Sequence, residues 1–154
     1  MRALEPWVVE PLEVFLAESS ARLTLLMTSS GQVVAQHGFS RSLDVMTAAA
    51  LGAGIVASTE EIARLMGVTR FAGLVHHGER QSCMLSAFGT PRGRWIGLVV
   101  FGPETSVGIV QLFFEQMVAQ LVSSAPREQA PPPTLAENFE SELDASLKAL
   151  FGRT

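Results

Sequence analysis

A stretch of 15 residues without charge, residues 45–59, lies in the middle of this 154-residue chain. It belongs to a longer pattern that predicts one helix over residues 42–67. In that helix Ser42 caps the N-terminus, Asp44 lies in the first turn, and Gly67 ends the helix in the left-handed conformation. A surface helix normally has one apolar stripe and one charged stripe. Because this helix has no charged stripe over residues 45–59, we expect protein on both of its sides.

The two sides of the predicted helix differ in the size of their residues. One side carries aliphatic residues and alanines: Val45, Ala49, Val56 and Ala63, with Ile55 and Ile62 beside them. The opposite side is built mainly of small residues: Met46, Ala50, Gly54, Ala57 and Ser58. Small side chains let another backbone approach closely, although each helical glycine costs about 1 kcal/mol relative to alanine. A fully buried core helix is the alternative, but one domain of this size has too few elements to surround a helix. We interpret the small side as a docking face for a second subunit and a partner protein.

The remaining patterns predict an α/β (α+β) fold with a five-stranded antiparallel sheet and flanking helices. A short helix is expected over residues 7–17, followed by a hairpin of residues 23–28 and 32–36 around Gly31. Three apolar runs after the long helix, residues 71–75, 83–88 and 95–101, are separated by turn-rich segments and predict a meander. The last run does not alternate, so we place it centrally with both faces covered. A final helix, capped by Thr105 or Ser106, is expected to end near Ser123. The expected order is helix, two strands, long helix, three strands, helix.

Composition changes after this domain. We expect a domain over residues 1–124, a proline-rich linker over residues 125–134, and an amphipathic tail helix over residues 135–154. The tail has apolar residues at helical spacing: Phe139, Leu143, Leu147 and Leu150. Its acidic residues gather toward its N-terminal half, where the helix dipole favours negative charge.

Charge and hydropathy limit the classes of partner. The net charge is -4, the isoelectric point is about 5.3, and Lys148 is the single lysine, so we expect no nucleic-acid partner. The uncharged apolar runs at residues 45–59 and 105–114 fall short of the ~20 apolar residues that span a bilayer, so we expect no membrane partner. The N-terminus has no signal-peptide pattern, and the single cysteine, Cys83, excludes an internal disulfide, which predicts a cytoplasmic protein. A mean hydropathy of +0.29 favours an oligomer or an obligate partner.

The residues that carry chemistry form no recognisable catalytic set. The Gly52-Ala53-Gly54 segment lacks a third glycine and follows no strand, and no Walker-type motif occurs. His76 and His77 are adjacent on a strand and point to opposite faces, so they do not converge on one metal ion. Cys83 lies in an apolar strand and is interpreted as a small buried hydrophobe. We therefore predict no enzyme activity, no catalytic residue, no metal site and no cofactor.

Three arginines lie at expected hairpin turns: Arg80, Arg92 and Arg94. In principle an arginine in such a place can reach the phosphates of a partner as an arginine finger. We interpret all three as solvated turn residues.

Several motifs resemble the Roadblock/dynein light chain family, in particular its MglB-like bacterial branch. These are the first turn over residues 30–34, the helix end over residues 62–67 with Phe71 and the turn at residues 77–79, and residues 99–101 leading into 105–110. Together they cover roughly residues 8–124. Each motif is weak alone, and their order and spacing carry the resemblance. The acidic and apolar tail after a linker also has a counterpart in that branch.

The resemblance implies a homodimer whose sheets join edge to edge and whose long helices form one broad face. That face would dock one small Ras-like GTPase of the MglA type, which switches cell polarity or motility, in the cytoplasm and at the cell poles. In the family the GTPase is activated by reshaping of its own switch regions, without an arginine finger from the Roadblock partner. By match of position, the docking residues here would be Ala50, Gly54, Ala57, Ser58 and Glu61. The tail, with Phe139, Leu143, Leu147 and Leu150, would touch a second site on the GTPase and influence nucleotide release.

Two departures separate this chain from the branch. Glu61 is bulky and acidic where the branch tends to be small, and the last helix has glutamines where relatives often carry basic residues: Gln111, Gln116 and Gln120. Binding of a GTPase is therefore implied more directly than its activation. Two alternatives stay open. One is a Roadblock scaffold subunit without effect on GTP turnover. The other is a profilin-like ligand-sensing module, which would need a polar-lined cavity beneath its sheet, where the predicted face is mostly aliphatic.

Overall fold

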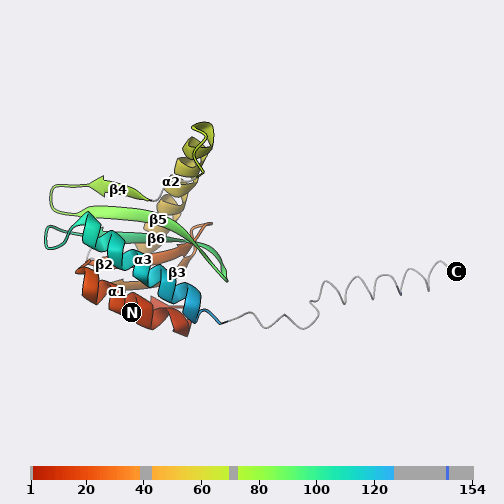
Figure 1. Cartoon of the computed structure of the whole chain (residues 1–154), viewed down its shortest axis with the longest axis horizontal. Coiled ribbons are helices and arrows are strands. Elements are labelled where there is room, and N and C mark those ends of the chain that lie inside the picture. Colours follow the sequence, from red (N-terminus) through yellow and green to blue (C-terminus); the bar gives the residue numbers. More distant parts are fainter. Residues whose placement is uncertain (1, 39–42, 70–72, 127–144, 146–154) are drawn as a thin grey trace.

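A six-stranded antiparallel sheet forms the middle layer of the computed structural model, which describes residues 2–38, 43–69, 73–126 and 145 (Figure 1). The strands are β1 (Arg2–Ala3), β2 (Leu23–Thr28), β3 (Val33–Gly38), β4 (Leu74–His77), β5 (Ser82–Thr90) and β6 (Gly93–Phe101). Their order across the sheet is β1-β3-β2-β6-β5-β4. The five predicted strands and the meander are confirmed. The two-residue strand β1, which pairs with β3, was not predicted because two residues carry no periodicity.

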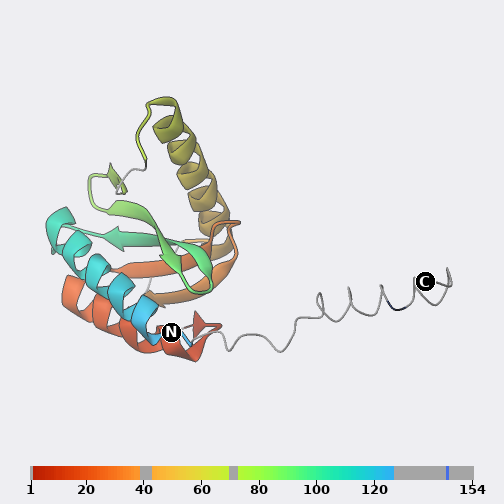
Figure 2. The same cartoon turned by 45° about the vertical axis from the view of Figure 1, so that its right-hand side comes forward.

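Helices cover both faces of the sheet. They are α1 (Val9–Ser19), which follows the short 3-10 helix η1 (Pro6–Val8), then α2 (Val45–Leu65) and α3 (Val107–Ser124). Helices α1 and α3 lie side by side on one face, and α2 lies on the other (Figures 1 and 2). Figure 2 shows that the C-terminal half of α2 rises away from the sheet. The molecule therefore has three layers, and only part of α2 rests on the middle one.

Strand β6 is the centre of the sheet, as its unbroken apolar run predicts. It pairs with β2 on one side and β5 on the other, so that Leu98 lies between Leu25 and Leu85. Residues 95–99 are all buried. Trp95 and Val99 pack in the core beneath α1 and α3, whereas Ile96 and Leu98 pack in the core beneath α2. One strand thus supplies side chains to both cores.

An aromatic cluster fills the core between the sheet and the pair α1 and α3. The ring of Phe114 from α3 meets Phe15 at a centroid distance of 5.9 Å and Phe88 at 5.7 Å, both edge to face. Trp95 stacks on Trp7 at 5.5 Å. Gly97 makes room for this cluster, since a Cβ added there would lie 2.5 Å from Cε2 of Phe114. The missing side chain lets α3 lie directly on β6.

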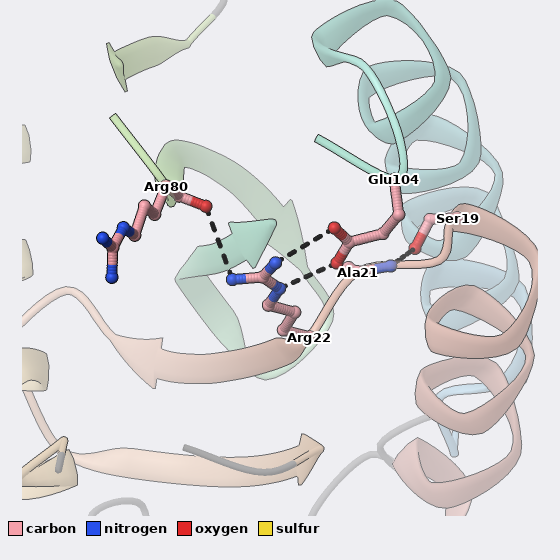
Figure 3. Close-up of polar contacts among 5 residues, drawn as sticks. All are labelled: Ser19, Ala21, Arg22, Arg80 and Glu104. Carbon is pink, nitrogen blue, oxygen red and sulfur yellow. Dashed lines mark hydrogen bonds and ion pairs between the residues drawn. The ribbon is translucent and has the colours of Figure 1, made fainter. Parts of the chain in front are cut away.

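An ion pair holds three connections of the fold together (Figure 3). The Arg22 guanidinium, just before β2, donates from Nε and Nη2 to the two carboxylate oxygens of Glu104, at 2.7 and 3.0 Å. It also donates to the backbone oxygen of Arg80 at 3.5 Å. These two hydrogen bonds between Arg22 and Glu104 lower the pKa of the Glu104 carboxyl and raise the pKa of the Arg22 guanidinium. Because Glu104 lies between β6 and α3, and Arg80 between β4 and β5, this contact joins the connection before β2 to those two connections.

Replacing Gly97 by alanine tests how closely α3 rests on the sheet. We expect Gly97→Ala to lower the free energy of unfolding by about 1–3 kcal/mol, because the buried Phe114 ring cannot move aside without disturbing its ring contacts. Gly89→Ala in the neighbouring strand is the matched control, since no heavy atom lies within 4 Å of its added Cβ. Denaturant unfolding of both variants measures the difference. Equal stability of the two variants would show that α3 is not held against Gly97.

Candidate functional site

Both ends of α2 are defined by local hydrogen bonds. At the N-terminus the Asp44 carboxylate accepts the backbone N–H of Thr47 at 3.2 Å and its hydroxyl at 2.7 Å. The prediction of Ser42 as the cap is therefore wrong, because Asp44 occupies the cap position and the helix begins at Val45. At the C-terminus Gly67 is left-handed, with φ of 70°, as predicted. The N–H of Val68 bonds to the oxygen of Ala63 at 2.9 Å, which closes a Schellman motif.

Small residues form the side of α2 that rests on the sheet. Ala49, Gly52 and Ala53 are buried there. A Cβ on Gly52 would lie 3.3 Å from Cδ2 of Leu85, so the helix backbone is already close to β5. The predicted side of Val45, Ala49, Val56 and Ala63 is thus the inner side. Ile55 and Ile62, expected beside it, instead face outward.

Large apolar side chains are exposed on the outer side of α2. The exposed fractions are 78% for Met46, 63% for Leu51, 37% for Ile55, 52% for Ile62, 74% for Leu65 and 63% for Met66. At 100° per residue, Leu51, Ile55 and Ile62 form one flank of this outer side. This large-residue flank was not predicted, although its spacing of four and seven residues could have revealed it. Exposed apolar surface of this extent indicates a partner.

The five docking residues expected on α2 lie together on the other flank of its outer side. Ala50, Gly54, Ala57, Ser58 and Glu61 are all exposed. No atom lies within 4 Å of a Cβ added at Gly54, so this flank is open in the described structure. The outer side of α2 therefore has a large-residue flank and a small-residue flank. We call the two together the α2 face.

Polar groups on the α2 face are satisfied within the helix. The hydroxyl of Ser58 donates to the Gly54 oxygen at 2.9 Å, and that of Thr59 donates to the Ile55 oxygen at 2.8 Å. Arg64 donates from Nε to the Glu61 carboxylate at 3.1 Å, which lowers the pKa of Glu61. The acidic residue that departs from the family pattern is thus balanced by its neighbour one turn later. A face of this kind loses little hydration when a partner covers it.

An ion pair connects α2 to the sheet. Glu60 of α2 contacts the Arg94 guanidinium at the start of β6. Arg94 is exposed, as expected, but it lies in β6 and is paired with Glu60. Arg80 and Arg92 are exposed, in the connections on either side of β5. The pair with Glu60 links the rising half of α2 to the start of β6.

The crevice between α2 and the sheet is small. It is lined by Val56, Glu60, Leu74, Leu85 and Arg94 among others, and it encloses about 30 Å³. That space suits about one water molecule, whereas pockets for metabolites measure roughly 300–1,000 Å³. The described residues beneath α2 do not form the polar-lined cavity that a profilin-like sensor would need.

Groups with catalytic or metal-binding potential are dispersed. Among the described residues, no three His, Cys, Asp or Glu side chains lie close enough to hold a metal ion. His76 and His77 follow one another on β4, opposite Cys83 and Ser82. Cys83 is half-buried, and burial raises the pKa of its thiol, which makes it a weaker nucleophile near neutral pH.

Helices α2 and α3 are each long and apolar enough to cross a membrane by length and composition alone. From the sequence, by contrast, we expect no membrane partner, because the uncharged runs within these helices are shorter than a bilayer span. In the structure, however, each helix uses one side to cover the sheet. A helix that left the sheet for lipid would uncover the buried apolar side chains beneath it, at a high cost in free energy.

Solved structures identify the relatives of this chain, although no protein-family model and no curated protein sequence matches it. The gliding protein MglB from Thermus thermophilus is 31% identical, with a TM-score of 0.69 over 77% of this chain and 88% of that one. MglB with a tetrameric arrangement is 30% identical, with a TM-score of 0.69 over 77% and 87%. A Roadblock/LC7 domain from Streptomyces avermitilis is 15% identical and shares the fold, with a TM-score of 0.61 over 71% and 89%.

The three layers and the exposed long helix define a Roadblock-type domain. The likeness to the Thermus protein extends beyond the fold to the sequence, over most of both chains. This chain belongs to the Roadblock/MglB-like family. The expected tail residues Phe139, Leu143, Leu147 and Leu150 lie outside the described residues, as does most of the expected linker.

The cap of α2 makes a testable contribution to stability. We expect Asp44→Ala to lower the melting temperature. Asp44→Asn should keep the melting temperature close to that of the parent, because asparagine still accepts the Thr47 N–H. The hydrogen bonds from Thr47 lower the pKa of Asp44. The contribution of its charge is therefore complete above the ordinary aspartate pKa and is lost as the pH falls through the lowered value. Thermal unfolding over a pH series measures this. A stability difference between the parent and Asp44→Asn that persisted at the lowest pH would contradict it, because a protonated Asp44 and an asparagine accept the Thr47 N–H alike.

Proposed function

We propose that this protein is a non-catalytic, homodimeric regulator of a small Ras-like GTPase of the MglA type. Its role would be in cell polarity or motility, in the cytoplasm and at the cell poles. The observation that carries the proposal is the α2 face, which is apolar, internally satisfied and unpartnered within the described chain. Similarity to a protein described as a gliding protein supports the link to motility.

The two flanks of the α2 face support two different contacts. The large-residue flank of Leu51, Ile55 and Ile62 suits helix pairing between two subunits, because such side chains interdigitate at roughly 8–10 Å between helix axes. Strand β4 ends the sheet order, so its outer backbone groups are available to pair with a second copy. The small-residue flank of Ala50, Gly54 and Ala57 then stays free for a GTPase whose backbone approaches closely.

Regulation without an arginine finger is consistent with the charges near α2. Arg64 is paired with Glu61, and Arg94 is paired with Glu60. Withdrawing either guanidinium would leave a carboxylate unpaired beside the docked partner. We infer that the protein acts on the GTPase by shape, holding its switch regions in the conformation that completes its own active site.

Single-turnover GTP hydrolysis by an MglA-type GTPase from the same genome tests the proposal. We expect this protein to accelerate hydrolysis, with the rate reaching a plateau as its concentration rises. A stable complex without any change in hydrolysis or nucleotide exchange would favour the Roadblock scaffold instead. The absence of a complex with either GTP- or GDP-loaded GTPase would exclude both.

An arginine in the middle of the small-residue flank should block docking. We expect Ala57→Arg to weaken GTPase binding at least about 30-fold, because a long charged side chain cannot be buried against a closely packed partner. The dimer should persist, since Ala57 lies away from the large-residue flank. Ala119→Arg, at an exposed alanine of α3, is the matched control and should bind normally. Pull-down and size-exclusion chromatography measure both properties, and unchanged capture by Ala57→Arg would reject the small-residue flank as the docking site.

Removing residues 135–154 separates the tail from the domain. We expect the truncated protein to keep its fold and its dimer, because the described core is complete by Ser124. Nucleotide exchange or the lifetime of the GTPase complex should change. Far-ultraviolet circular dichroism and stopped-flow release of a fluorescent nucleotide measure the two. Loss of the fold on truncation would make the tail part of the core.

A further inference from the structure

A groove runs between α1 and α3, on the side of the sheet opposite α2. Its two connected parts enclose about 120 Å³ and about 280 Å³, and both are lined by Pro11 and Gln120. Phe15 and Met117 are buried and form the floor of the first part. Figures 1 and 2 both show the two helices running alongside each other, with no other element of the described part of the chain over them. The groove thus has an apolar floor and partly polar walls, and the described residues leave it open to solvent.

The α1 wall of the groove carries two carboxylates. Glu18 lines the first part and Glu10 the second. They are eight residues apart on one helix, which places their backbones about 12 Å apart. Val14 lies between them on the same stripe and lines the groove. An apolar floor therefore lies beside two acidic groups at a fixed spacing.

The opposite wall extends the apolar surface beyond the groove. Phe113 lines the groove from α3, and Ile109 lies one turn before it. Ile109 is 44% exposed and Leu112 is 51% exposed. Side chains three and four residues apart are neighbours on a helix, so these residues form one continuous apolar strip with Phe113.

All charged side chains of α1 and α3 are acidic. Their charged residues are Glu10, Glu13 and Glu18 of α1 and Glu115 of α3, with no lysine or arginine in either helix. Arg22, which follows α1, is already paired with Glu104. The four carboxylates make no ion pair within the described residues. A negative potential next to an apolar groove favours a partner with basic and apolar residues.

We propose that the groove between α1 and α3 is a second docking site, which binds a cationic amphipathic helix of a partner protein. Apolar side chains of that helix enter the groove, and two basic residues seven or eight positions apart meet Glu10 and Glu18. This site is independent of the α2 face and of the GTPase. The charges disfavour other occupants: the acidic tail of this chain, an anionic membrane and the same acidic face of a second copy would all be repelled.

A synthetic peptide tests the charge and spacing together. The probe is a fluorescein-labelled helical peptide of Ala, Leu and Gln with two lysines seven positions apart, titrated with the full-length protein and followed by fluorescence anisotropy. We expect it to bind more tightly than a peptide with glutamates at the same positions, and more tightly than one with lysines four positions apart. Added salt should weaken it. Equal binding of the seven-spaced and four-spaced peptides would overturn the proposal.

Matched variants locate the peptide on the protein. Glu10→Gln combined with Glu18→Gln should weaken binding about fivefold. Glu13→Gln combined with Glu79→Gln removes the same charge outside the groove and should leave binding unchanged. Leu112→Gln should also weaken binding, whereas Leu65→Gln on the α2 face should not. Equal loss in the two glutamate pairs would mean general charge attraction, and loss in Leu65→Gln would place the peptide on α2.

Two further outcomes would assign the groove to the protein itself. If removing residues 135–154 strengthens peptide binding several-fold, the tail occupies the groove. If the protein forms an assembly larger than a dimer that Leu112→Gln dissociates, a second copy occupies it, in keeping with the tetrameric arrangement of a relative. Either result would overturn the proposal of a separate cationic partner, and neither would affect the proposal for α2.

Discussion

The contact between α2 and the sheet depends on residues that have almost no side chain. Ala49, Gly52 and Ala53 bring the helix backbone close to β2 and β5. Since one side of the helix is occupied by small residues, its large residues are turned outward, among them Leu51, Ile62 and Leu65. Burying one such side chain fully is worth about 1.5–3 kcal/mol. The isolated subunit does not gain that free energy. It would be gained when a partner covers the face.

Ion pairs keep this exposed face in place and nearly neutral. Glu60 joins α2 to Arg94 of β6, and Glu61 joins Arg64 one turn later. Exposed pairs of this kind contribute little to stability on their own. Their effect here is on recognition: each carboxylate already has a cation, so a partner can cover the helix without leaving a charge unpaired. The Arg22 contact with Glu104 links the connection before β2 to the connection that leads into α3.

The two faces of the sheet therefore offer two kinds of surface. The α2 face is nearly neutral and apolar, so a partner proposed for it would be selected by fit. The layer of α1 and α3 is acidic with an apolar groove, and it selects by charge as well. Strand β6 links the two, since alternate side chains such as Trp95 and Ile96 pack beneath opposite layers. A protein with this arrangement can bind one partner on each side without the two competing for the same residues.

The sequence by itself determined the helices and the strands other than β1, their order, the central place of β6 and the exposure of Ala50, Gly54 and Ala57. These follow from periodicity, glycine positions and the absence of charge, which are local properties of the chain. The tertiary structure decided which side of α2 meets the sheet, and so turned Ile55 and Ile62 outward. It also decided the pairings of Arg94 with Glu60 and of Arg22 with Glu104, and the groove between α1 and α3. Each of these joins residues that are distant in sequence, and the spacing of side chains along one element carries no information about which other element will lie beside it.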